Sequence, residues 1–368
     1  MNPEKYEPQA DLSQTEKEQI SHENHEDKDE HPLKEGRNSD IYEVNSLEHE
    51  LISKYQPKFL AKGGEHIVYE APEHPNVVVK VATELVKKII DWNVEHNQPI
   101  DSLSPEVKFY AQEDLKQELK RYKQLKKYFG REHVLLQRKF LVKVPITEKI
   151  LNAMYDGKAP ITGNEVWAIM MIQKRAEELN DPKHETLVAG YSEMEDVSPA
   201  QYNEVTEHLV FGKDHDQKME REQLLAVQSN EYLESLVKRS ENETGLQEAL
   251  KDMIERAIAY TEETGEALDL AGTDNVAFFQ KVGMWTYRLV DALYPDEKNM
   301  VNKTKIALLK LSTGASIDKG EENILMNMLN YVRTINGLAE QFGVVGRINV
   351  VPEGMKLGTL DFSKIIRP

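Results

Sequence analysis

The chain has 368 residues, of which 39% are hydrophobic, enough for a sizeable core and for two lobes. Its formal net charge of -18 argues against nucleic acid or an anionic membrane as the main partner, because both are bound through a surplus of Lys and Arg. Cysteine is absent, which excludes disulfides, thiolate metal sites and cysteine nucleophiles. With no apolar leader and no apolar run of membrane-spanning length, the sequence predicts a soluble cytoplasmic protein.

The first 50 residues are the most acidic part of the chain. They carry 15 Asp and Glu against 5 Lys and Arg, a net charge of about -10. They also contain few apolar residues, so burial cannot offset the entropy lost on ordering. We therefore expect residues 1–50 to form a disordered acidic tail.

Strand and helix patterns alternate over the next 120 residues. A first strand near Lys58–Ala61 precedes two β-branched runs, Ile67–Ala71 and Val77–Ala82, which the prolines and asparagine between them join into a hairpin. Apolar residues then recur at helical spacing from Pro105 to Phe129, where Gly130 stands in the position of a helix terminator. Two more strands are predicted at Phe140–Val144 and Val166–Ile172.

The second half of the chain is predicted to be mainly helical, with one short hairpin. The predicted helices are 217–237, 246–260 with an end at Thr264-Gly265, 303–313 and 321–342, and the hairpin strands are 275–279 and 285–290 about Gly283. The charged, partly helical segment from about 183 to 240 is predicted to be an insertion that covers a cleft or docks a partner.

A glycine-bearing segment and a strand lysine form the first motif. The segment is Leu60-Ala61-Lys62-Gly63-Gly64-Glu65-His66-Ile67-Val68-Tyr69, and the lysine is Lys80 in Val77-Val78-Val79-Lys80-Val81. Glycine has no Cβ, so it permits a tight turn and a close approach of the backbone to phosphate oxygens. A buried lysine would add a positive charge. The pair predicts a hairpin over a phosphate.

The second motif follows the helix that ends at Gly265. It is Leu268-Asp269-Leu270-Ala271-Gly272-Thr273-Asp274-Asn275-Val276-Ala277-Phe278-Phe279, and it is followed by Leu289-Val290-Asp291-Ala292-Leu293. In this order the two motifs resemble those of the protein kinase-like superfamily, written G-x-G-x-x-G-x-V with V-A-I-K, then the catalytic loop and D-F-G. The chain resembles a divergent bacterial member of that superfamily.

The resemblance implies an α+β, bilobal protein kinase-like fold and a transfer of the ATP γ-phosphate to a hydroxyl. The small antiparallel-sheet N-lobe would span 51–172 and the mainly helical C-lobe 173–368, with the charged segment 183–240 inserted in it. The cofactors would be ATP and Mg²⁺. The acceptor, a small molecule or a protein, is not identified by the sequence.

The resemblance also assigns the residues that would bind the nucleotide. Gly63, Gly64 and Val68 would cover it, and Lys80 would hold its phosphates with a glutamate of the helix as partner. Glu106, Glu113 and Glu118 all lie on that helix, and Glu118 matches best by its distance to the following strand. The backbone of a linker at Ile172-Gln173 would hold the adenine edge.

For the chemical step, the resemblance makes Asp269 the base and Asn275 and Asp291 the metal ligands, since Mg²⁺ prefers hard oxygen ligands. Asp274 is a rival for a metal-facing role, because Asp269 and Asn275 stand one residue further apart than in the family.

The chain also departs from the family pattern. Ala61 and His66 replace two glycines, Ala267-Leu268 stand where His-Arg is expected, and Ala292-Leu293 replace Phe-Gly. These departures keep an alternative open, a pseudokinase that binds nucleotide or partners without transfer.

Overall fold

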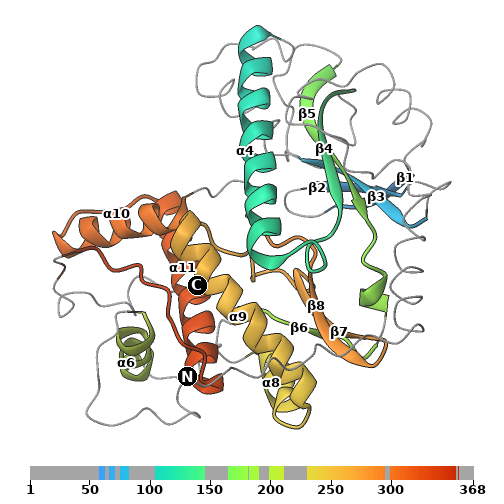
Figure 1. The fold of residues 1–368 in the computed structure, drawn as a ribbon. Helices are drawn as coiled ribbons and strands as arrows, with labels where there is room; N and C mark the ends of the chain where they lie inside the picture. The colour runs from blue at the N-terminus through green and yellow to red at the C-terminus, as the bar shows by residue number, and fades with distance from the viewer. Residues whose placement is uncertain are drawn as a thin grey trace, which may run out of the picture. The chain divides into compact units, whose positions relative to one another are not determined.

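The computed structural model describes most of one compact unit, Ile41–Pro368 (Figure 1). The described residues are 58–62, 66–70, 75–82, 104–145, 165–180, 182–189, 199–210, 230–294, 299–353 and 355. The predicted acidic tail and the glycines Gly63 and Gly64 lie outside these ranges.

Five antiparallel strands form the first sheet, in the order β1-β2-β3-β5-β4. Their bounds are β1 (Lys58–Lys62), β2 (His66–Glu70), β3 (Val77–Ala82), β4 (Gln137–Pro145) and β5 (Glu165–Lys174). β5 lies between β3 and β4, and its residues from Ala168 to Gln173 are all buried. The predicted hairpin is confirmed, because β2 and β3 pair in antiparallel register.

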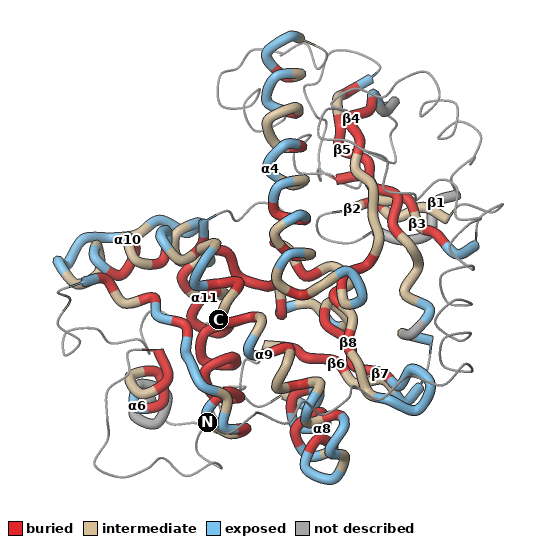
Figure 2. Tube along the Cα trace, in the orientation of Figure 1, coloured by how far each residue is buried: buried red, intermediate tan, exposed pale blue. Residues whose placement is uncertain are grey.

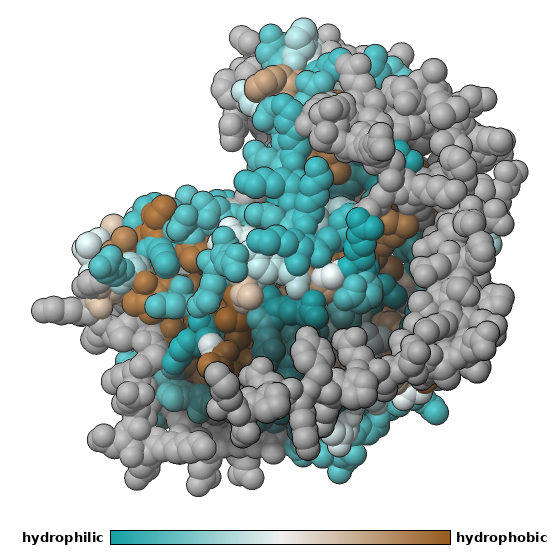
Figure 3. Space-filling model, in the orientation of Figure 1, coloured by the Kyte–Doolittle hydropathy of each residue, from teal (hydrophilic) through white to brown (hydrophobic). Residues whose placement is uncertain are grey.

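Helix α4 (Pro105–Phe129) follows the sheet's first three strands and runs alongside β4 and β5 (Figure 1). The Ser104 side chain caps its first turn, and Gly130, with φ of 83°, ends it as predicted. The helix is amphipathic: Leu115 and Phe129 are fully buried, whereas Lys120 is exposed, and its visible face is hydrophilic (Figure 3).

Helices dominate the described residues that follow, together with a second, three-stranded antiparallel sheet in the order β6-β7-β8. The elements are β6 (Glu185–Thr186), α6 (Pro199–Leu209), α8 (Glu231–Ser240), α9 (Thr244–Thr264), β7 (Val276–Lys281), β8 (Met284–Leu289), α10 (Met300–Ser312) and α11 (Lys319–Phe342), with a short 3-10 turn, η2 (Glu177–Asn180), after β5. Gly265 and Gly283 adopt positive φ at the predicted helix end and hairpin turn.

One hydrophobic core joins these helices to the end of α4. It includes Tyr122 and Phe129 of α4, Tyr260 of α9 and Tyr331 of α11. Figure 2 shows α11 buried over much of its length. The fold class α+β with an antiparallel sheet is therefore confirmed. Within the described ranges, no helix combines the length and the apolar character needed to cross a membrane.

Candidate functional site

Backbone pairing brings the Asp269–Asn275 loop against the segment that carries Asp291. The Asp269 N–H donates to the Ala292 carbonyl at 3.0 Å, and the Val290 N–H donates to the Asn275 carbonyl at 2.9 Å. These two bonds lie on either side of Asp291. The main chain thus holds Asp269, Asn275 and Asp291 in one place, although the first and the last are 22 positions apart in the sequence.

Lys80 reaches the same place from the first sheet. It lies on β3, opposite Val68 of β2 and Met171 of β5. Its Nζ is 3.0 Å from Oδ2 of Asp291, which is 211 positions later in the chain. The Lys80 side chain is 11% exposed and that of Asp291 is 40% exposed. The ion pair therefore joins the first sheet to the loop region and stays open to solvent on the aspartate side.

The two aspartates of this site are shifted in opposite directions. Desolvation raises the pKa of Asp269, and the negative charge of Asp291 raises it further, against hydrogen bonds that include one from the Ala271 N–H at 2.9 Å. For Asp291 desolvation also acts upwards, but the positive charge of Lys80 and other nearby groups outweighs it and lowers the pKa. Asp269 is consequently the better proton acceptor, whereas Asp291 keeps its negative charge more readily.

Asn275 is positioned by its neighbours in the loop. Its Nδ2 donates to the Asp269 carbonyl at 3.2 Å. A Cβ at Gly272 would lie 2.7 Å from that nitrogen, so glycine leaves the room that the amide occupies. With the nitrogen engaged, the carboxamide oxygen is the atom that could bind a metal.

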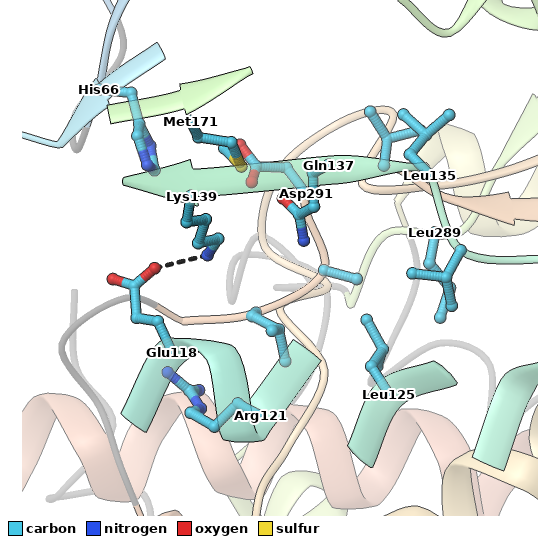
Figure 4. A pocket seen from close by; sticks show the side chains of 14 residues that line it. His66, Glu118, Arg121, Leu125, Leu135, Gln137, Lys139, Met171, Leu289 and Asp291 are labelled. Atoms are coloured by element: carbon cyan, nitrogen blue, oxygen red, sulfur yellow. Dashed lines mark hydrogen bonds and ion pairs between the residues drawn. The ribbon is translucent and has the colours of Figure 1, made fainter. Parts of the chain in front are cut away.

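The expected ion pair between Lys80 and Glu118 is not what the structure forms. Glu118 instead accepts a hydrogen bond from Lys139 of β4 at 2.5 Å (Figure 4). The reason is the strand order: α4 packs on β4 and β5, whereas Lys80 lies on β3, on the other side of β5. Desolvation alone would raise the pKa of Glu118, but the charge and hydrogen bond of Lys139 lower it.

Lys139 is therefore a residue that the sequence analysis missed. It shares Met171 as cross-strand neighbour with Lys80, so both lysines point to the same face of the sheet. The signal that singled out Lys80, a lysine inside an apolar strand, was present here too, in Lys139-Phe140-Leu141-Val142.

The linker prediction at Ile172 and Gln173 is also corrected. β5 continues to Lys174, and both residues pair with β3 on one side and β4 on the other. Their backbone groups are committed to the sheet, so neither offers a free edge to a base. Gln173 instead uses its side chain, whose Nε2 donates to the Val290 carbonyl at 2.6 Å, next to Asp291.

A small cavity is lined by the Glu118–Lys139 ion pair and by Asp291 (Figure 4). Its polar lining includes His66 of β2, Glu118, Lys139 and Asp291, and its volume of about 30 Å³ gives room for about one or two water molecules rather than a nucleotide. Burial lowers the pKa of His66, so the imidazole is neutral near pH 7. Glu118, Lys139 and Asp291 thus line one cavity.

Asp274, the proposed rival for a metal, has another partner. Its Oδ1 lies 3.1 Å from Nε2 of His184. Its backbone has φ of 66°, in the left-handed region that residues other than glycine enter rarely. Asp274 thus forms part of the turn before Asn275 and pairs with His184.

The donor set suits a hard cation, although it is small. Asp291, Asp269 and Asn275 offer carboxylate and carboxamide oxygens of the kind that Mg²⁺ prefers, with water and phosphate completing its shell. Among the described residues, no group of three or more His, Cys, Asp or Glu gathers in a way that could hold a metal. Any metal here would therefore depend on ligand oxygens as well.

No protein-family model, curated protein or solved structure matches this chain.

Proposed function

We propose that the chain is a divergent, bilobal member of the protein kinase-like superfamily that transfers the γ-phosphate of ATP to a hydroxyl acceptor. The observation that carries the proposal is the 3.0 Å contact between Lys80 and Asp291. The resemblance requires these two distant residues at one phosphate site, and they do meet. A small antiparallel sheet followed by a mainly helical half is compatible with the same reading.

The proposed roles follow from charge and position. Lys80 holds the nucleotide phosphates, while Asn275 and Asp291 hold Mg²⁺. Asp269 orients the acceptor hydroxyl and takes its proton, for which its raised pKa is favourable. Phosphoryl transfer is mostly positioning and charge neutralisation, so these few groups suffice. When bound, Mg²⁺ would neutralise negative charge on the phosphate oxygens.

Ligand binding in this proposal separates an existing ion pair. Lys80 and Asp291 neutralise each other in the structure. A magnesium nucleotide offers each a new partner of opposite charge, the metal for Asp291 and the phosphates for Lys80. The exchange is balanced in charge and takes place where Asp291 is 40% exposed.

The alternative is a pseudokinase, a binding or scaffolding module without transfer. One contact favours it: Glu118 is paired with Lys139, so the lysine–glutamate pair that the resemblance implies is replaced. The departures from the family glycines and from D-F-G point the same way.

Thermal unfolding with and without Mg-ATP tests the proposal first. We expect native protein to be stabilised by Mg-ATP, because a ligand that binds only the folded state raises its melting temperature. The Lys80→Met variant is expected to lose that shift, and Lys120→Met, an exposed lysine of α4, to keep it. Stabilisation that survives in Lys80→Met would contradict the site.

Turnover then separates the two candidates. Phosphate transfer or release from labelled ATP is expected for native protein and for the surface control Glu255→Gln, and to fall by about 100-fold or more in Asp269→Asn. Binding without turnover in native protein would establish the pseudokinase instead.

A further inference from the structure

The start of the segment 183–240, the predicted insertion, contacts the proposed metal site through Thr186 of β6. The Thr186 hydroxyl accepts a hydrogen bond from the Asp274 N–H at 2.9 Å and donates one to the Val276 carbonyl at 3.3 Å. Asp274 and Val276 are the two neighbours of Asn275. One hydroxyl, on a residue that is 6% exposed, therefore holds the main chain on both sides of the proposed metal ligand.

The main chain at this point needs such support. Asp274 has φ of 66°, a conformation that costs an L-residue on the order of 1 kcal/mol or more. Its N–H is fixed by Thr186 and its carboxylate by His184, at 3.1 Å. Both contacts come from the same short stretch, so β6 and the residue two before Thr186 hold the strained turn that presents Asn275.

The residues after Thr186 extend the contact along the loop. The Leu187 N–H donates to the Val276 carbonyl at 2.9 Å, and the Ala189 N–H donates to the Leu270 carbonyl at 2.7 Å. Residues 186–189 therefore bracket the loop from Leu270 to Val276, which contains Asn275.

β6 is itself anchored to α8. Arg239 of α8 donates to the Lys183 carbonyl at 2.8 Å and forms an ion pair with Glu185 at 3.0 Å, and Ser235 donates to the other carboxylate oxygen of Glu185 at 2.8 Å. These contacts hold β6, and with it Thr186, against α8.

We propose that Thr186 is a positioning residue of the metal site, whose hydroxyl aims the Asn275 carboxamide by holding the main chain on both sides of it. This inference rests on the proposed function. It gives the segment after residue 183 a definite task, to shape the loop that binds Mg²⁺. Loss of a group that orients a metal ligand typically weakens metal binding by about 10-fold to 100-fold.

The test is a Mg²⁺ titration at fixed ATP, followed by the shift in melting temperature, on native protein and three variants of Thr186. Thr186→Val keeps the shape of the side chain and removes both hydrogen bonds. Thr186→Ala removes the hydrogen bonds and the methyl group. Thr186→Ser keeps the hydroxyl. We expect the half-saturating Mg²⁺ concentration to rise about 10-fold or more in the Val and Ala variants and to stay native in the Ser variant. The response to ATP in EDTA, which reports Lys80, is expected to be unchanged in all three.

A purely structural role would lower the ligand-free melting temperature and leave the half-saturating Mg²⁺ concentration unchanged, and that result would overturn the inference. A parallel loss of the response to ATP in EDTA would overturn it too, because the whole site would then be disturbed. If one of the two hydroxyl-free variants does not fold, the other decides. Native protein without any response to Mg-ATP would overturn the proposed function itself, and this inference with it.

Discussion

Lys80 and Lys139 point to the same face of the first sheet, one on either side of Met171, yet their ion pairs differ in kind. Lys139 and Glu118 lie 21 positions apart, and their side chains are only 10% and 14% exposed. Lys80 and Asp291 lie 211 positions apart, and Asp291 keeps 40% of its side chain exposed. The first pair fixes α4 on the sheet, whereas the second leaves its carboxylate partly open to solvent, as the proposed exchange with a ligand requires. A pair of lysine and carboxylate therefore serves packing in one place and, in the proposed function, ligand binding in the other.

The largest effect is expected from breaking the buried pair. Lys139→Met leaves the Glu118 carboxylate buried without its cation, so we expect the free energy of unfolding to fall by about 3 kcal/mol in urea denaturation. Lys120→Met on the exposed face of α4 is the matched control and should stay within about 0.5 kcal/mol of native. Similarly small losses of unfolding free energy in both variants would show that the Glu118–Lys139 pair does not fix α4 on the sheet.

Acid should weaken the Glu118–Lys139 ion pair, because protonation removes the negative charge of Glu118. The folded-state pKa of Glu118 is lowered from its ordinary value of 4.5, so the folded state binds this proton less readily than the unfolded state. Its stabilisation is complete above pH 4.5 and is lost as the pH falls from 4.5 through the folded-state pKa. We expect the difference in unfolding free energy between native protein and Glu118→Gln to be constant above that pH and to shrink below it. A difference that grows in acid would contradict the sign.

The smallest change in stability is expected at the Lys80–Asp291 pair, whose carboxylate is partly open to solvent. Lys80→Met should lower the free energy of unfolding by less than about 1 kcal/mol, because solvent screens Asp291. The same variant is expected to lose the response to Mg-ATP, so its effect on binding exceeds its effect on stability. A double-mutant cycle with Asp291→Asn measures the pair directly, and a coupling as large as that of Lys139 with Glu118 would show that both pairs are structural.

Several elements could be predicted because their signals are local. The helix from Pro105 to Phe129 has its apolar period and its terminal Gly130 within one stretch of sequence. The hairpin about Gly283 and the helix end at Gly265 likewise depend on glycines at positions where the backbone adopts positive φ. The meeting of Lys80 with Asp291 was expected from the order of the two motifs and is formed in the structure.

Other features depended on distant partners and could not be read from local pattern. β5 extends past Ile172 because the Lys174 N–H finds the Leu136 carbonyl and the Arg175 N–H finds the Asn76 carbonyl. β6 has two residues, too few to show any periodicity, so Thr186 gave no signal.

The sequence by itself determined the chain order of most strands and helices, the turns that glycine permits and the residue types available for the proposed phosphate and metal site. Only the tertiary structure decided which charges meet: Glu118 with Lys139, and Lys80 with Asp291. The physical reason is that helix and strand periods are set by neighbours within a few residues, whereas the partner of a buried charge is set by which strand lies next to which helix.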